Sequence, residues 1–139
     1  MMNERIEQAV ENFKSGYNCS QSVAAAFADI YGIDREIMLR MSASFGGGIG
    51  KMRQTCGAAC GMFLLAGLEN GSTTPKDILG RDNNYKLVQQ LAEKFAEENG
   101  SMICGELLGL TCSNSNPKRP CVKMVESAAK IFAEYLSSK

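Results

Sequence analysis

Histidine and tryptophan are both absent from this 139-residue chain, and proline occurs only three times. Without histidine the chain has no Ser-His-Asp triad, no HExxH zinc site and no CxxCH haem attachment of its own. An excess of one charge is also lacking, because fifteen basic residues balance fifteen acidic ones. Proteins that bind nucleic acid neutralise phosphates with a basic face, so we expect no nucleic-acid partner.

Long apolar runs are missing as well. The longest stretch, near residues 58–68, is interrupted by glycine and is too short to cross a bilayer, so we expect no membrane insertion. The chain opens with Met1–Arg5 and lacks the basic segment and apolar run of a secretory signal. An apolar fraction of 45% and a charged fraction of 22% are typical of globular proteins. These features predict one cytoplasmic domain over residues 1–139.

Apolar residues recur at helical spacing along the whole chain, and no alternation lasts long enough for a strand. Asn18 and Gln21 are spaced as a capping box at a helix start, and Thr55 is the expected cap of a strongly apolar helix. The expected helices end near residues 16, 32, 45, 68, 100 and 136, with the fifth beginning at residues 82–83 and the last at Cys121. Pro75 fits a short helical turn, and residues 112–120 read as a polar loop. The pattern predicts an all-α domain of about six helices, orthogonal or bundle-like.

Six cysteines are spread along the chain instead of being paired in one CxxC unit: Cys19, Cys56, Cys60, Cys104, Cys112 and Cys121. In a reducing cytosol such residues bind metal or cycle redox state more often than they form structural disulfides. The alternative is that some are small buried apolar residues, and for Cys60 and Cys112 both interpretations are equally favoured. Sulfur is therefore the expected reactive element.

Cys19, Cys56 and Cys121 each lie at a predicted helix N-terminus. The first turn of a helix offers unpaired N–H groups and the positive end of the helix dipole. Both stabilise a thiolate, which is the nucleophilic and metal-ligating form of cysteine. We therefore expect thiolate chemistry at these three positions.

Cys56 and Cys60 lie four residues apart, so on a helix they share a face one turn apart. This spacing could place a resolving thiol beside a reactive one, which makes Cys56 and Cys60 redox candidates. The small residues between them, with Gly61, are equally consistent with close helix–helix packing.

The glycine tract at residues 46–50 does not match a phosphate-binding loop, because Phe45 and Met52 occupy positions that the P-loop motif reserves for Gly and Ser or Thr. It can instead bring backbone close to a sulfur site, so Gly46, Gly47 and Gly48 are candidate cofactor-binding residues. Lys51 and Arg53 would add positive charge near a thiolate, although solvated loop charge is the more ordinary interpretation of each.

Several segments resemble a known family: Asn18–Val23, Ser44–Gly50, Thr55–Ala58 with Gly61, Cys104–Gly109, and Cys121 with Val122, Ala128 and Ala129 behind it. The chain is similar to small helical redox-active proteins named for the cysteine pattern C…CGAxxG…C…C, a family that resembles the non-haem domain of split-Soret cytochromes. The resemblance implies that Cys19, Cys56, Cys104 and Cys121 ligate an iron–sulfur centre or carry dithiol chemistry. It also implies association with oxidoreductase or transport systems. Covalent haem c is excluded, because CxxCH and histidine are absent.

Three hypotheses follow from these residues. The first is an iron–sulfur or other metal centre on Cys19, Cys56, Cys104 and Cys121, used for electron transfer or redox sensing. Zinc is less favoured, because structural zinc usually takes closely spaced ligand pairs. The second is a metal-free thiol–disulfide protein that uses Cys56 with Cys60 or Cys19. The third is a helical docking module for an oxidoreductase or transporter, with the small-residue helix at residues 56–68 as a homodimer surface. No paired carboxylates are placed for acid–base catalysis, so no enzyme substrate is indicated.

Overall fold

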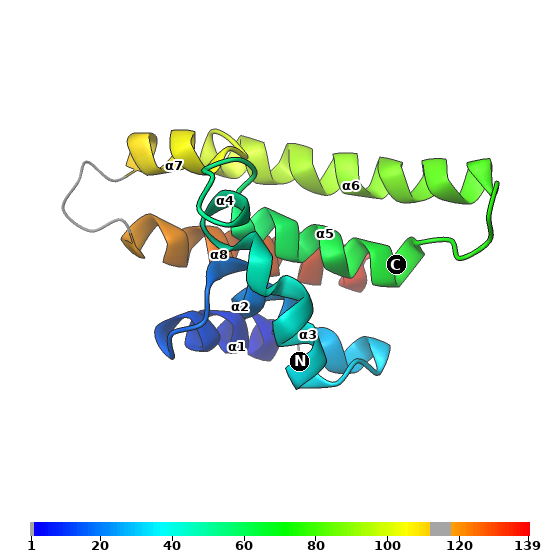
Figure 1. The fold of residues 1–139 in the computed structure, drawn as a ribbon, viewed down its shortest axis with the longest axis horizontal. Helices are drawn as coiled ribbons and strands as arrows, with labels where there is room; N and C mark the ends of the chain where they lie inside the picture. Colours follow the sequence, from blue (N-terminus) through cyan, green and yellow to red (C-terminus); the bar gives the residue numbers. More distant parts are fainter. Residues whose placement is uncertain (1, 112–117) are drawn as a thin grey trace.

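A computed structural model of the chain describes residues 2–111 and 118–139. Most of these residues are helical (Figure 1): α1 (Met2–Lys14), α2 (Cys19–Ala25), α3 (Arg35–Ser42), α4 (Gly46–Ile49), α5 (Gly57–Asn70), α6 (Ile78–Asn99), α7 (Cys104–Thr111) and α8 (Lys118–Ser137), with 3-10 turns at Ala28–Tyr31 and Ala43–Phe45. The one strand-like pairing in the described part is an isolated antiparallel bridge between Thr55 and Ile103. The predicted all-α class is confirmed. Within these same ranges, no helix combines the length and apolar character needed to cross a membrane.

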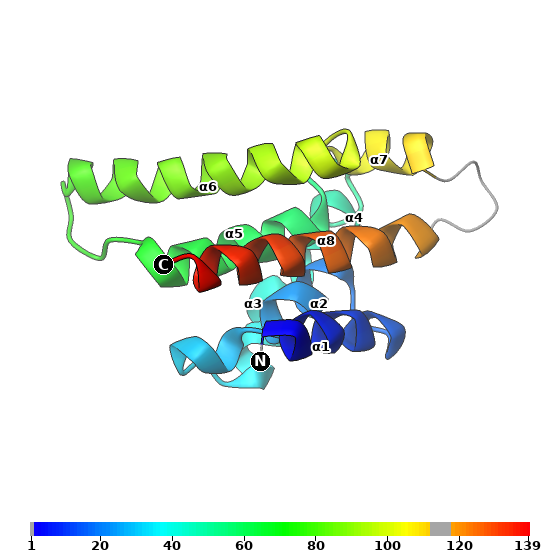
Figure 2. The same ribbon diagram turned by 180° about the vertical axis from the view of Figure 1, so that it is seen from behind.

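The longer helices lie in layers (Figures 1 and 2). Helix α6, with α7 continuing beyond its end, covers one side of the α5 and α8 layer, and α1 and α2 cover the other side. Helix α1 packs along α8, and α2 packs along α5. The α4 segment, the start of α5, α7 and the first turns of α8 come together at one end of the molecule.

Local capping signals were reliable where a side chain serves its own helix. The Gln21 N–H donates to Asn18 Oδ1 at 2.9 Å, and the Asn18 N–H donates to Gln21 Oε1 at 3.1 Å, which confirms the capping box of α2. The Asp34 carboxylate accepts from the Ile37 N–H at the start of α3. Gly100 ends α6 in the left-handed conformation that favours glycine, with φ of 90°.

Two expected helix starts were wrong. Cys56, not Thr55, is the N-cap of α5, because Thr55 is engaged in the bridge to Ile103. Helix α6 begins at Ile78 instead of residues 82–83, since the Asp77 side chain accepts from the Gly80 N–H and caps an earlier turn.

Two further expectations concern loops. The segment at Pro75 is a turn and not a helix, and α8 begins at Lys118, three residues before Cys121. The predicted polar loop from Cys112 therefore ends earlier than expected, and its first part, residues 112–117, lies outside the described residues.

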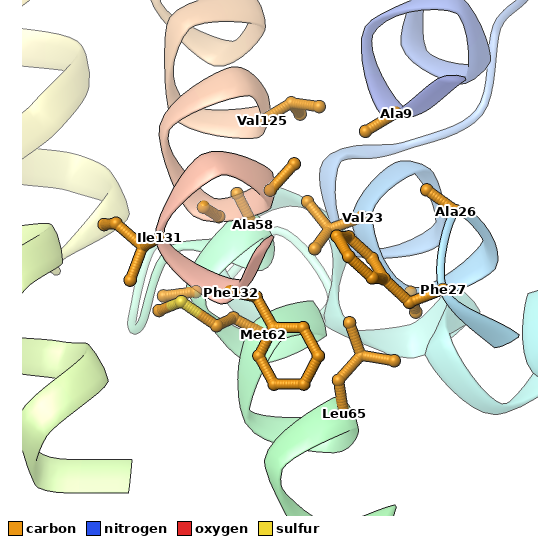
Figure 3. Packing of buried hydrophobic residues seen from close by; sticks show 14 of the residues in the cluster. Ala9, Val23, Ala26, Phe27, Ala58, Met62, Leu65, Val125, Ile131 and Phe132 are labelled. Atoms are coloured by element: carbon orange, nitrogen blue, oxygen red, sulfur yellow. The ribbon is translucent and has the colours of Figure 1, made fainter. Parts of the chain in front are cut away.

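The core forms where α2, α5 and α8 meet, and it is built from apolar side chains of all three (Figure 3). Phe27 and Phe132 are fully buried, and their rings pack edge to face with centroids 5.2 Å apart. Met62 and Leu65 of α5 fill the space beside them. Burying a side chain of this size contributes about 1.5–3 kcal/mol, so this cluster fixes the relative positions of the three helices.

Candidate functional site

Four cysteines from four separate segments line a single cavity of about 60 Å³ at the end of the molecule where α2, α5, α7 and α8 begin. They are Cys19, Cys56, Cys104 and Cys121, the four that the resemblance singles out. The predicted cofactor-binding residues Gly47 and Gly48 line the same cavity. The fold therefore brings together residues that span about a hundred positions of sequence.

Each of the four cysteines lies at the N-terminal end of a helix. Cys19 and Cys104 are the first residues of α2 and α7, Cys56 is the N-cap of α5, and Cys121 is the fourth residue of α8. The sequence predicted this placement for three of them, and Cys104 adds a fourth. Four helix dipoles thus present their positive ends to one cavity.

Short backbone pairing holds Cys56 opposite Cys104. The Cys56 N–H donates to the Met102 carbonyl at 2.7 Å, and the Cys104 N–H donates to the Gln54 carbonyl at 2.6 Å. These bonds flank the bridge between Thr55 and Ile103. Two cysteines that are 48 positions apart are therefore fixed by main-chain contacts and do not depend on side-chain packing alone.

The wall of the cavity beside Cys104 is a left-handed loop at residues 46–53, which includes the short α4, where Gly47 and Gly48 do not have helical backbone angles. Gly47, Gly48, Ile49, Gly50, Lys51 and Arg53 all have positive φ. Such a conformation costs a residue with a Cβ roughly 1–2 kcal/mol, so the loop stores strain at Ile49, Lys51 and Arg53. Backbone bonds from the Arg53 and Gln54 N–H groups to the Gly47 and Gly48 carbonyls close it.

Gly48 is where the loop approaches the site most closely. A Cβ built on Gly48 would lie 2.6 Å from Cys104 Cβ and 2.8 Å from Arg53 Cα. Only glycine tolerates both this crowding and a φ of 73°. Gly46, the third candidate of the tract, does not line the cavity. The Asn18 side chain occupies the space where a Cβ of Gly46 would lie.

The small residues of α5 let α2 approach closely, as the packing interpretation predicts. A Cβ on Gly57 would lie 3.3 Å from Cys19 Cβ, and a Cβ on Gly61 would lie 2.8 Å from the Ser20 carbonyl oxygen. This close approach places Cys19 beside the start of α5.

Arg53 brings a cation to the cavity. Its Nη1 lies 3.6 Å from Cys104 Sγ, and its charge also acts on Cys121. Arg53 therefore faces the thiols. The Lys51 side chain is exposed, which agrees with its interpretation as a solvated charge of the loop.

Burial and hydrogen bonding set the pKa values of these thiols differently. Burial raises the pKa of Cys56 to about 12, although the Ala59 and Ala58 N–H groups lower it. The pKa of Cys19 is raised, chiefly by its interaction with the neighbouring Cys121 thiol and then by burial. The same interaction lowers the pKa of Cys121 to about 7, against the effect of burial. The effect expected of a helix start is found at Cys56, where backbone N–H groups lower the pKa but burial outweighs them. At Cys121 the pKa is lowered by Cys19 and Arg53 and not by helix N–H groups.

The remaining cysteines do not join this group within the described residues. Cys60 is buried one turn beyond Cys56, but its thiol contacts the Thr55 carbonyl oxygen at 3.8 Å, and it does not line the cavity. Burial raises the pKa of Cys60 to about 11. Cys112 lies outside the described residues.

The apolar part of the lining was not predicted. Leu107 and Leu108 of α7 and Met124 of α8 complete the cavity. They stand three or four residues after Cys104 and Cys121, so helical spacing from each cysteine was a usable signal.

The thiols do not converge on one point. Across residues 2–111 and 118–139, no three His, Cys, Asp or Glu side chains are grouped closely enough to hold a metal ion. The five cysteines of these ranges are all thiols. A ligand that bridges several cysteines would have to draw them inward from the cavity wall.

Comparison with known proteins gives one match. A protein-family profile described as "Putative redox-active protein (C_GCAxxG_C_C)" matches residues 17–135, which include all four cysteines of the cavity. The second cysteine box in that description reads GCAxxG, whereas this chain has Cys56 before Gly57. No curated protein and no solved structure matches. Since the match covers well over half of the chain, this protein belongs to the C_GCAxxG_C_C family.

Proposed function

We propose that the protein is an electron-transfer or redox-sensing protein that holds an iron–sulfur or similar metal centre on Cys19, Cys56, Cys104 and Cys121. The observation that carries the proposal is that these four cysteines, from four helix starts, line one small cavity. When bound, an iron–sulfur centre supplies one-electron chemistry at a potential set by charge, hydrogen bonds and burial.

The donor set fits such a centre. Thiolates are the preferred ligands of iron–sulfur clusters, and four of them complete the usual ligand count. The surrounding lining is glycine backbone and apolar side chain, apart from Arg53. Gly48 lets the backbone of the loop pack against Cys104, since an added Cβ would lie 2.6 Å from Cys104 Cβ.

The chain's own residues would act on the site in two ways. Four helix N-termini and the Arg53 guanidinium supply positive potential, which stabilises thiolates and the net negative charge of a four-thiolate centre. Leu107, Leu108 and Met124 limit the access of water. Positive charge near a redox site favours its reduced form, so Arg53 is expected to raise the potential.

The test is anaerobic purification followed by a visible spectrum and by iron, zinc and sulfide analysis. We expect iron with matching sulfide and charge-transfer absorbance, either as purified or after anaerobic reconstitution. Serine substitution of Cys19, Cys56, Cys104 or Cys121 should each reduce the metal content and the visible absorbance.

Cys60→Ser is the matched control, because Cys60 is buried like the others but lies outside the cavity. It should keep full metal content. Full metal content in all four cavity variants would contradict the proposal, as would a colourless protein that gains nothing on reconstitution. Zinc without iron would make the centre structural instead of redox-active.

A further inference from the structure

A polar groove on the surface of the molecule shares no residue with the cysteine cavity. It has a volume of about 520 Å³ and lies between α1, the 3-10 turn at Ala28–Tyr31 and the start of α3, on the side of the molecule away from α6 (Figure 1). Sites for small molecules commonly measure about 300–1,000 Å³. Charged side chains of both signs line the groove: Glu4, Arg5, Asp29 and Arg35. A ligand of this groove therefore has to match both signs.

Arg35 is a cation that is held in place without a carboxylate partner. Its Nη2 donates to Asn12 Oδ1 at 3.1 Å, and its guanidinium lies over the Tyr17 ring, 5.6 Å from the centroid. Asn12 is only 2% exposed and its Nδ2 donates to the Ser22 carbonyl at 3.1 Å, so the anchor of Arg35 is itself fixed. In the described part of the chain Arg35 forms no ion pair. The remaining N–H groups of its guanidinium can pair with the two oxygens of a carboxylate.

The other end of the groove carries a net negative charge. Arg5 donates to both carboxylate oxygens of Asp29, at 2.6 and 3.1 Å, so this pair adds no net charge. Glu4 also lines this end, and its charge acts on Arg5, but among the described residues its carboxylate forms no ion pair. Glu4 is therefore open to an ammonium group.

The positive and negative ends are separated along α1. Asn12, which holds Arg35, comes seven positions after Arg5, and seven helical residues rise about 10 Å. Three residues of extended peptide span about the same length, at roughly 3.3–3.6 Å each. We propose that the groove binds a short peptide with free ends, of about three residues, whose carboxylate pairs with Arg35 and whose ammonium group lies at Glu4. This binding involves neither the cysteines nor a metal, so it stands apart from the proposed metal centre.

The experiment titrates trialanine with free ends into the full-length protein at low ionic strength and follows the heat of binding. We expect saturable one-to-one binding. Amidation of the peptide's C-terminus and acetylation of its N-terminus should each weaken the affinity by about tenfold or more, because each removes a charge-assisted contact. The absence of saturable binding, or an equal affinity for either modified peptide, would overturn the proposal. Tighter binding of inorganic phosphate that displaces trialanine would also overturn it.

Three variants assign the binding to residues. Arg35→Gln should weaken the affinity for trialanine by about tenfold or more. Glu4→Gln should bind the free and the N-acetylated peptide equally well, because the partner of the ammonium group is gone. Arg40→Gln is the matched control, since Arg40 is exposed on the same helix, pairs with Glu36 at 3.8 Å and does not line the groove.

The control variant should keep the affinity of the unmodified protein. An Arg35→Gln protein that binds trialanine as tightly as the unmodified protein would place the ligand elsewhere and overturn the proposal. If Arg35→Gln does not fold, the free, amidated and acetylated peptides on the unmodified protein and on Glu4→Gln decide.

Discussion

Replacing Gly48 with alanine should damage the cysteine cavity more than any similar change in the same loop. Gly48 is buried and has a φ of 73°, and an added Cβ would lie 2.6 Å from Cys104 Cβ and 2.8 Å from the Gln54 nitrogen. The Arg53 Cα also lies 2.8 Å from the added Cβ. The Arg53 Cα and the Gln54 nitrogen are backbone atoms, so they cannot move aside without a shift of the chain.

The expected magnitude has two parts. A left-handed conformation destabilises alanine by roughly 1–2 kcal/mol. Alanine also restricts the unfolded chain more than glycine does, which offsets about 0.4–1 kcal/mol of this loss. Overpacking against fixed atoms adds about 1–3 kcal/mol. Gly48→Ala should therefore lower the free energy of unfolding by about 1–5 kcal/mol, most of it from overpacking.

Gly50→Ala is the matched control. Gly50 also has positive φ, 57°, but the nearest atom to an added Cβ is the Ser44 carbonyl oxygen at 3.9 Å. This variant should lose about 1 kcal/mol or less, from the backbone alone. Urea denaturation of both variants, with m-values compared, measures the difference between them.

If the two variants lose the same stability, the close approach of the loop to Cys104 is not present in the folded protein. The account of Gly48 as part of the cavity wall would then be refuted. A Gly50→Ala loss that is larger than the Gly48→Ala loss would also refute it, because a Cβ on Gly50 would meet only the Ser44 carbonyl oxygen, at an ordinary contact distance of 3.9 Å.

Three other outcomes follow from the same structure. Asn18→Ala removes a capping box and a hydrogen bond to a neighbouring 3-10 turn, so it should lower the free energy of unfolding, measured by urea denaturation, by about 1–2 kcal/mol. Asp34→Ala removes a single cap and should lower it by no more than about 1 kcal/mol. A larger loss for Asp34→Ala than for Asn18→Ala would contradict the capping assignment. Lys51→Gly relieves the strain of a left-handed conformation, with φ of 65°, and should raise the free energy of unfolding by up to about 1 kcal/mol. The control is Met52→Gly, because Met52 is exposed and does not have positive φ; this variant should lower the free energy of unfolding by about 0.4–1 kcal/mol. Burial raises the pKa of Cys60 from 9.0 to about 11, so between these pH values the unfolded chain releases the Cys60 proton before the folded protein does, and the free energy of unfolding falls as the pH rises. Cys60→Ala lacks this group, so its free energy of unfolding should fall by up to about 2 kcal/mol less over the same window. Identical pH profiles of the two proteins would contradict this.

Much of the local structure could be predicted from the sequence, because a helix and its cap depend on residues three or four positions apart. The Asn18 capping box and the ends of helices at Gly32 and Gly100 were of this kind. The helix start at Thr55 failed because a partner far along the chain, Ile103, takes that residue into a bridge. The start of α6 failed for a local reason, since the Asp77 side chain caps an earlier turn and residues 82–83 lie inside the helix.

The site was predicted as a set of residues but not as a geometry. Helix starts identified three of the four cavity cysteines, and the cysteine pattern supplied Cys104. The glycine tract indicated close backbone approach, which the structure shows at Gly48. The contact between Cys19 and Cys121 could not be predicted, because it depends on how α2 and α8 cross.

The sequence by itself determined the helical class, the absence of histidine chemistry, and thiols at the starts of helices. Each of these depends on composition or on hydrogen bonds within one turn. Only the tertiary structure decided that four of the cysteines share a cavity, that Arg53 faces Cys104, and that Cys60 does not belong to the group. These contacts join segments many residues apart, and their positions result from the packing of the whole core, where each buried side chain contributes only a few kcal/mol and none fixes the arrangement alone.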